Sequence, residues 1–230
     1  MDESMQKFTE ERRDEPPAIE GSASTSIRYS LRFTGAPTLQ QLVAVAVATA
    51  VYTVLSWLAV IGLPSPFFGV SAIFLAIGFG IPFGIWFGGW AFVIGYIGNF
   101  IGAGLLIGTP LLNAIPFGAA DIIQLGLPML LYRIFAPRIG LSAIGKDILT
   151  VRGFLFFLAC AVIPNNILGA LYGNGILVAG GLLKPEVYLP SVVIWALSNM
   201  IITIIIGTAL LAGIGPIVER FGLTIRNLFN

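Results

Sequence analysis

Residues 66–132 form an almost uninterrupted apolar stretch in which Asp121 is the only Asp, Glu, Lys or Arg. A transmembrane helix needs about 20 apolar residues, so this stretch is long enough for several crossings of a bilayer. The composition of the whole chain agrees: 57% of the 230 residues are hydrophobic, only 10% are charged, and the mean hydropathy is +0.95. Soluble domains carry about 25% charged residues. The sequence therefore predicts an all-α integral membrane protein.

Turn residues divide the apolar sequence into about six transmembrane helices, which we expect to form one bundle. The first helix ends at the Pro-Ser-Pro of residues 64–66, and we place further breaks at IPFG (81–84) and GTP (108–110), because Gly and Pro interrupt helices. A polar linker follows at residues 136–152. The predicted spans are 41–63, 67–81, 83–107, 112–133, 153–180 and 188–212.

The distribution of charge predicts three segments and an orientation. Residues 1–38 form a charged tail that buries little apolar surface and is expected to be disordered; residues 39–218 form the helical domain, and residues 219–230 form a short tail. Basic residues favour cytoplasmic loops. With both termini in the cytoplasm of a multi-pass plasma-membrane protein, only Lys184 of residues 28–230 would be a basic residue outside. A re-entrant hairpin over residues 67–107 would keep the same loop sides and stays an alternative.

Several classes of function lack the residues that they need. The chain has no His and a single Cys, Cys160, and it has neither a carboxylate pair nor a cluster of metal ligands in its apolar part. No phosphate-binding loop and no serine nucleophile elbow is present. The net charge of +1 gives no indication of nucleic-acid binding. We expect a membrane protein that is not an enzyme, with no cofactor and no metal, whose partners are lipid and a small-molecule substrate.

The polar residues of the last three predicted spans lie at similar depths. An Asp at the centre of a membrane costs about 2.5–3.5 kcal/mol, and Gln124 lies on the same helix face as Asp121. These side chains either bind one another and hold the bundle together, or line a small-molecule pocket open to the outside. In the second case Phe117, Tyr172 and Trp195 supply apolar walls. The candidate substrate-binding residues are Asp121, Gln124, Asn165, Asn166, Asn199 and Trp195.

Small residues recur at four-residue spacing on the first span. Ala44 and Ala48 form one small face, and Ala46 and Ala50 form another. Small faces let helix backbones approach closely. A neighbour within the bundle would need only one such face, so the other could meet a second protein.

These features together resemble the substrate-binding membrane subunit, the S component, of energy-coupling factor (ECF) vitamin transporters. The resemblance covers residues 39–218 in outline and rests on three stretches: AVAVATA (44–50), GIPFGIWFGGWAFVIGYIGNFIG (80–102) and FGAADIIQ (117–124). It implies that a vitamin-like molecule binds from outside through helices 4 to 6 and the loop between helices 1 and 2. It also implies a transmembrane coupling subunit driven by two cytoplasmic ATPase subunits, with a binding subunit that topples in the membrane to release its substrate inside.

The resemblance assigns roles to residues by their position. Ala44, Ala48, Ala46 and Ala50 would dock on the coupling subunit, and the polar candidates would line the pocket. The chain departs from the family in the loop after the first span, which we expect to be only PSPFFG, shorter than the lid of an S component.

Two other classes of function stay open. One is a membrane sensory or scaffold module. The other is a stand-alone secondary transporter in which Asp121 carries a proton; such transporters usually show an internal repeat, and the two halves of this chain show none.

Overall fold

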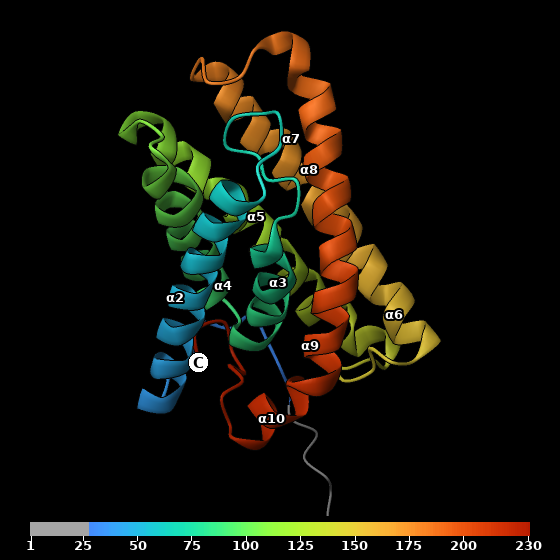
Figure 1. The fold of residues 1–230 in the computed structure, drawn as a ribbon. Coiled ribbons are helices and arrows are strands. Elements are labelled where there is room, and N and C mark those ends of the chain that lie inside the picture. Colours follow the sequence, from blue (N-terminus) through green and yellow to red (C-terminus); the bar gives the residue numbers. More distant parts are fainter. Residues whose placement is uncertain (1–27) are drawn as a thin grey trace, which may run out of the picture.

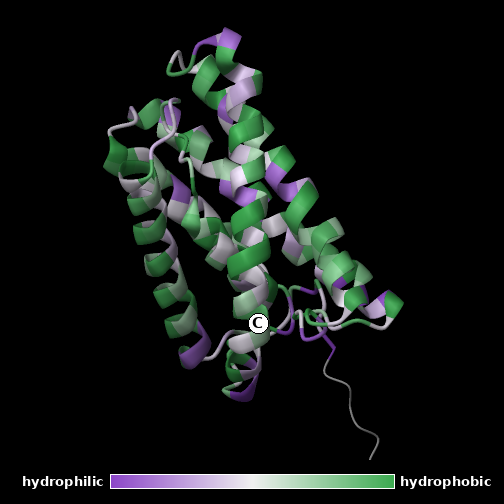
Figure 2. Cartoon of the chain, turned by 45° about the vertical axis from the view of Figure 1, so that its right-hand side comes forward, coloured by the Kyte–Doolittle hydropathy of each residue, from purple (hydrophilic) through white to green (hydrophobic). Residues whose placement is uncertain are grey.

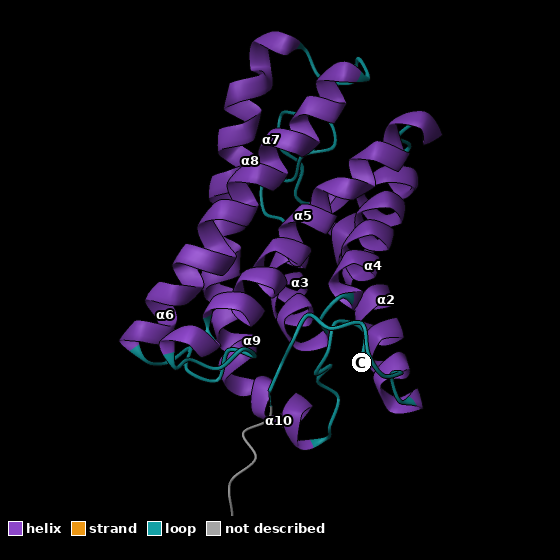
Figure 3. Ribbon diagram, turned by 180° about the vertical axis from the view of Figure 1, so that it is seen from behind, coloured by secondary structure: helices purple, strands orange, loops and turns teal. Residues whose placement is uncertain are grey.

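The computed structural model describes residues 28–230, and in this range every regular element is a helix and no strand forms (Figure 3). Figure 2 shows hydrophobic residues along the helices and hydrophilic segments gathered mainly at the two ends of the bundle. Five helices of the described part are long and apolar enough to cross a membrane, which confirms the all-α membrane fold. They are Leu39–Gly62, Trp90–Ile107, Leu111–Ile139, Val151–Ala179 and Pro185–Gly213.

Most of these long helices consist of several segments joined end to end (Figure 1). In chain order the elements are α2 (Leu39–Gly62), α3 (Leu75–Phe87), α4 (Trp90–Ile97), η1 (Gly98–Gly104), η2 (Leu105–Ile107), α5 (Leu111–Phe135), η3 (Pro137–Ile139), α6 (Val151–Phe157), η4 (Leu158–Val162), α7 (Ile163–Ala179), η5 (Pro185–Val187), α8 (Tyr188–Ile202), η6 (Thr203–Gly207), α9 (Thr208–Gly213) and α10 (Gly215–Arg220).

A capping box begins α2. The Thr38 hydroxyl accepts a hydrogen bond from the backbone N–H of Gln41 at 3.2 Å, and the Gln41 side chain accepts from the N–H of Thr38 at 2.9 Å. This reciprocal pair satisfies two N–H groups that a helix start leaves free. The helix then runs without interruption to Gly62.

The second predicted span, 67–81, is wrong in its bounds. Helix α3 begins at Leu75, and residues 63–74 form a loop held by an antiparallel bridge between Pro64 and Ser71. The 13 residues of α3 reach roughly 20 Å at 1.5 Å per residue, less than the 30 Å hydrocarbon core. The sequence of residues 67–74 predicts a span because this loop is as apolar as a membrane helix.

The predicted break at IPFG (81–84) is also misplaced. Pro82 lies inside α3, and the chain turns instead at Gly88, whose φ of 62° favours glycine. A side chain there would also collide with the backbone, because a Cβ on Gly88 would lie 2.7 Å from the carbonyl oxygen of Leu228. Tertiary contact therefore sets this break. The predicted span 83–107 is accordingly replaced by the end of α3 and by the helix Trp90–Ile107.

The three long helices that follow agree with the predicted spans 112–133, 153–180 and 188–212 to within a few residues. Two of them, and the helix Trp90–Ile107, contain a π-helical stretch: η1, η4 and η6. η4 ends just before Pro164, which has no N–H to donate to the preceding turn. A π turn is a common local response to such a fault and is frequent near functional sites.

Helix α5 is the central element of the bundle and packs against α3, α4 and α7. Its contact with α4 is backbone to backbone, because a Cβ on Gly95 would lie 2.4 Å from the carbonyl oxygen of Asp121. Helix α2 approaches η1 as closely at Gly102, where a Cβ would lie 2.3 Å from the carbonyl oxygen of Thr53. The glycine at residue 95 thus lets α4 pack closely on α5 beside Asp121, and the glycine at residue 102 lets η1 pack closely on α2.

Both described terminal segments cover one end of the bundle (Figure 1). Arg133, near the end of α5, is 5% exposed and donates hydrogen bonds to the carbonyl oxygens of Ser30, Arg226 and Asn227 at 2.9–3.0 Å and of Ile225 at 2.5 Å. One guanidinium therefore joins the N-terminal and C-terminal segments to the membrane domain.

These contacts bear on the two predicted tails. Residues 28–38 run extended beside residues 225–230, with Ser30 N–H donating to the Arg226 carbonyl at 2.7 Å and Leu228 N–H donating to the Arg32 carbonyl at 2.9 Å. The other part of the predicted disordered tail, residues 1–27, lies outside the described residues. The C-terminal residues pack on the bundle because Arg133 and the turn at Gly88 need carbonyl partners.

Candidate functional site

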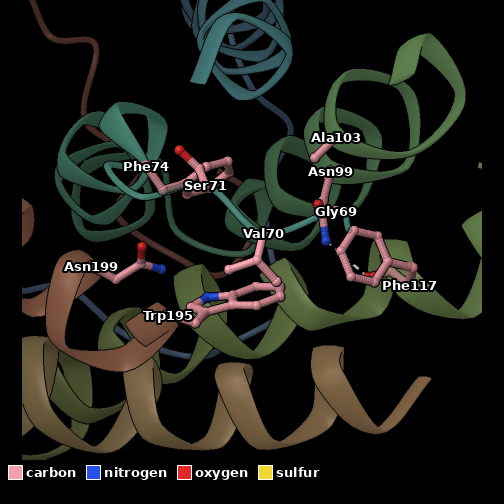
Figure 4. Close-up of a pocket in the computed structure, with 9 residues that line it drawn as sticks. All are labelled: Gly69, Val70, Ser71, Phe74, Asn99, Ala103, Phe117, Trp195 and Asn199. Carbon is pink, nitrogen blue, oxygen red and sulfur yellow. Dashed lines mark hydrogen bonds between the residues drawn. The ribbon is translucent and has the colours of Figure 1, made fainter. Parts of the chain in front are cut away.

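A small enclosed cavity lies beneath the loop 63–74, which covers the end of the bundle opposite the terminal segments (Figures 1 and 4). Its volume is about 10 Å³, room for the centre of roughly one water molecule. Four lining residues belong to the loop, and the others come from η1, α5 and α8. They are Gly69, Val70, Ser71, Phe74, Asn99, Ala103, Phe117, Trp195 and Asn199.

The loop reaches into the bundle with Val70, Ser71 and Phe74, which are its buried residues, and the Ser71 hydroxyl is satisfied inside the protein. The Ser71 hydroxyl lies 2.8 Å from the carbonyl oxygens of Ala59 and Ile73 and 3.0 Å from that of Leu63. Val70 is only 2% exposed. Irregular backbone in a membrane protein is tolerated where it is buried in protein or lines a cavity, and four residues of this loop line the cavity.

Asn199 of α8 faces the cavity and has no hydrogen-bond partner for either amide atom within the described residues (Figure 4). The residue is 1% exposed. A buried polar group without a partner costs about 1–3 kcal/mol. The Asn199 side chain therefore holds a donor and an acceptor that a water or a ligand in the cavity would satisfy.

Two aromatic rings in contact with each other form part of the cavity wall, and the Trp195 ring lies between Asn199 and Phe117 (Figure 4). The rings of Phe117 and Trp195 meet nearly edge to face, with centroids 5.9 Å apart. Gly173 of α7 makes room for the indole, because a Cβ there would lie 2.6 Å from Trp195 Cη2. Asn99 uses its amide nitrogen to bind the Phe117 carbonyl at 2.8 Å. This mixture of aromatic surface and a few polar atoms is typical of small-molecule sites.

Asp121 lies outside this cavity, in a contact between α5 and α2. The Tyr52 hydroxyl donates to Asp121 Oδ2 at 2.7 Å, and both side chains are fully buried. Asp121 Oδ1 has no partner within residues 28–230. The Tyr52 ring fits between glycines, since a Cβ on Gly80 or Gly98 would lie 2.3 or 2.2 Å from it. The carboxyl group thus has one donor, from the first transmembrane helix.

Gln124, Asn165 and Asn166 form a separate amide network between α5 and α7. Gln124 Nε2 donates to Asn166 Oδ1 at 3.1 Å, and Asn165 Nδ2 donates to the Gln124 carbonyl at 3.1 Å. Asn166 Nδ2 donates to the Val162 carbonyl at 2.7 Å and lies 3.5 Å from Thr203 Oγ1 in η6. All three amide side chains are fully buried. These hydrogen bonds join three helical segments, and each amide nitrogen in the network has an acceptor, whereas Gln124 Oε1 and Asn165 Oδ1 have no partner within the described residues.

The structure therefore divides the six candidate binding residues into three groups. Asn199 and Trp195 line the cavity, Gln124, Asn165 and Asn166 form the amide network, and Asp121 pairs with Tyr52. Sequence reasoning missed Tyr52, although a lone tyrosine among the aliphatic residues of the first span is a usable signal. It also missed the loop residues Gly69, Val70, Ser71 and Phe74, because they were assigned to a helix.

The two alanine faces of α2 have different surroundings. Ala44 and Ala48 line an apolar groove of about 590 Å³ whose other walls include Phe83, Trp86 and Val218 of α3 and α10. Ala48 is 3% exposed and Ala44 is partly buried. Ala46 and Ala50 are exposed on the outer side of the helix. One small face thus meets the chain's own helices, and the other is free of them.

No group of three His, Cys, Asp or Glu side chains that could hold a metal ion occurs in the described part of the chain. Comparisons with family models, with curated proteins and with solved structures find no match to this chain.

Proposed function

We propose that this chain is the substrate-binding membrane subunit of an ECF-type transporter, and that its binding site is the cavity beneath the loop 63–74. The observation that carries the proposal is Asn199, whose buried amide has no partner within the described residues and faces that cavity. Burying an amide without hydrogen-bond partners costs free energy, and a ligand that forms those hydrogen bonds would explain why it is there.

In this proposal the loop 63–74 is the lid that covers the site. At about 10 Å³ the cavity is too small for a vitamin-like molecule, so a ligand of that size enters only if the loop moves. Binding requires Val70 and Phe74 to withdraw. Gly69, with a φ of 71°, gives the loop a residue able to change conformation at low cost. The loop has 12 residues instead of the six expected from sequence, and it supports this role.

The lining indicates the chemistry of the substrate. None of the nine lining residues is charged. Aromatic surface from Phe117, Trp195 and Phe74 surrounds one free amide, which donates and accepts a hydrogen bond. We infer an uncharged substrate with a planar apolar part and an amide-like or carbonyl-like polar group. Asp121 is less suited to contact it, since Asp121 lies outside the lining and is bound to Tyr52.

Energy for uptake would come from partner subunits. The exposed face of Ala46 and Ala50 is available to the proposed transmembrane coupling subunit, and the groove at Ala44 and Ala48 lies on the adjacent face of the same helix. Two cytoplasmic ATPase subunits would drive that coupling subunit.

Binding to the purified chain tests the site. The unmodified protein is titrated with a panel of uncharged vitamins, and Asn199→Leu is compared with it. We expect a loss of affinity of roughly two- to tenfold for each hydrogen bond that disappears, because each contributes about 0.5–1.5 kcal/mol. The melting temperature should stay the same or rise, because Asn199 has no partner to lose.

Asn174→Leu is the matched control. Asn174 is also a buried amide, but its nitrogen donates to the Ala170 carbonyl at 2.9 Å and its oxygen accepts from the Ser191 hydroxyl. This variant should lower the melting temperature and leave the affinity of the folded protein unchanged. Unaltered binding in Asn199→Leu would exclude the cavity as the site.

A further inference from the structure

A recess with a net positive charge lies at the end of the bundle that holds both terminal segments. It opens between residues 28–29, the last turn of α5, the loop 137–150 and α10, and its volume is about 780 Å³. Small-molecule sites measure about 300–1,000 Å³. Among its lining residues Arg28, Arg133 and Lys146 are cationic, and only Glu219 is acidic.

The acidic residue compensates only part of this charge. Lys146 Nζ lies 2.6 Å from Glu219 Oε1. Arg133 donates only to backbone carbonyl oxygens, so it keeps its full positive charge. Arg28 forms no ion pair within residues 28–230. Two positive charges at the recess are therefore left without an anionic partner in the described part of the chain.

Arg133 also supplies a buried donor without an acceptor. The side chain is 5% exposed, and its Nε has no hydrogen-bond partner in the described residues. Charge-assisted hydrogen bonds to carboxylate or phosphate are the strongest that a guanidinium makes. An anion seated beside Arg133 would meet both its charge and its free donor.

The recess lies where the helices leave the hydrocarbon. Phe135, two residues before the lining residue Pro137, is 43% exposed, and the Arg138 guanidinium lies 5.6 Å over its ring. Basic side chains take this position when they extend from the apolar layer to the headgroups. Leu149 and Val151, at the other end of the loop, are 79% and 80% exposed. An anion at this level is surrounded by acyl chains as well as by water.

From these observations we infer that the recess binds the phosphate group of an anionic phospholipid. Arg28 and Lys146 face the phosphate, Arg133 provides the buried charge, and the acyl chains lie along the exposed end of α5. Basic pockets between transmembrane helices at the cytoplasmic side suit such headgroups. A bound lipid would hold the N-terminal segment, α5 and the loop 137–150 together.

Lipid retention by the full-length chain tests this site. The protein is reconstituted with mixtures of phosphatidylglycerol and phosphatidylcholine, and bound lipid is counted by native mass spectrometry. Phosphatidylglycerol should be retained selectively. Arg28→Gln and Lys146→Gln should each weaken its binding by roughly fivefold, since one basic residue near an anionic surface contributes about that factor.

Arg152→Gln is the control, because Arg152 is an exposed cation near the same end of the bundle but outside the lining. An equal loss in this variant would show diffuse attraction and overturn the site. Equal binding of sn-glycerol 3-phosphate would overturn the lipid in favour of a soluble anion. If a variant has a lower melting temperature than the unmodified protein in phosphatidylcholine, its lipid retention is not interpreted. The unmodified protein is then titrated with salt instead, and retention of phosphatidylglycerol that does not fall with rising salt overturns the inference.

Discussion

The buried polar side chains of this membrane domain differ in whether they have partners. Asn174 and Asn166 bind neighbouring groups through both amide atoms, so they stabilise helix contacts. Asn199 binds none, and it lies at the one cavity beneath the loop 63–74. Residue type is the same in all three cases. Only their surroundings distinguish Asn199, the candidate ligand contact, from Asn166 and Asn174, which join helices.

At the same scale, the pair Tyr52–Asp121 is expected to stabilise the fold without contacting substrate. Tyr52→Phe removes the only hydrogen bond that the buried carboxyl group forms with residues 28–230, so the free energy of unfolding should fall by about 1–3 kcal/mol. Asp121→Asn should cost less, because the amide oxygen still accepts from Tyr52. Chemical denaturation in detergent measures both changes.

Tyr96→Phe controls for the loss of a hydroxyl, since the Tyr96 ring stacks on Phe100 and its hydroxyl forms no hydrogen bond with the described residues. It should have little effect on stability. If Tyr52→Phe proved as stable as the unmodified protein, or if it weakened ligand binding while remaining stable, Asp121 would have another role.

At the scale of elements, the short helix α3 and the loop 63–74 together fill the path of one membrane crossing. The loop occupies the side near the cavity and α3 the side near the terminal segments (Figure 1). The loop backbone is bound internally, with Ala72 N–H donating to the Leu63 carbonyl at 2.8 Å and Ser65 N–H donating to the Val70 carbonyl at 3.1 Å. Internal hydrogen bonds therefore order the loop that we propose as the lid of the site.

Ser71 is expected to be the main attachment of this loop, since its hydroxyl is within reach of three carbonyl oxygens on α2 and in the loop. Ser71→Ala should increase amide hydrogen exchange over residues 63–74 and speed up ligand association. Ser65→Ala is the control, because Ser65 bonds only locally to Phe67, at 3.1 and 3.3 Å. Equal exchange in the two variants would mean that apolar packing, rather than Ser71, holds the loop.

At the scale of the whole molecule, charge is concentrated at one end. Of the described residues, only Lys184 and Glu186 are charged at the end near the cavity, and Asp121 is buried within the bundle. Basic residues gather at the end of the terminal segments; they are Arg28, Arg32, Arg133, Arg138, Lys146, Arg152, Arg220 and Arg226. This asymmetry predicts that the terminal segments face the cytoplasm and the loop 63–74 faces outward.

Cysteine labelling in intact cells tests this orientation after Cys160 is replaced by serine. Leu149→Cys places a thiol at a position that is 79% exposed in the loop 137–150, and it should resist a membrane-impermeant maleimide. Lys184→Cys, at the exposed opposite end, should react. The reverse pattern of labelling would invert the molecule and place the proposed lipid recess outside.

The sequence by itself determined the membrane class and the long helices from residue 111 onward, because hydropathy and proline positions act locally along the chain. It also identified Asn199 and Trp195 as binding candidates. Only the tertiary structure decided the turn at Gly88, the extent of the loop 63–74 and the pairing of Asp121 with Tyr52. Each of these depends on contacts between residues distant in the chain, and apolar residues read alike whether they form a helix facing lipid or a loop buried in protein.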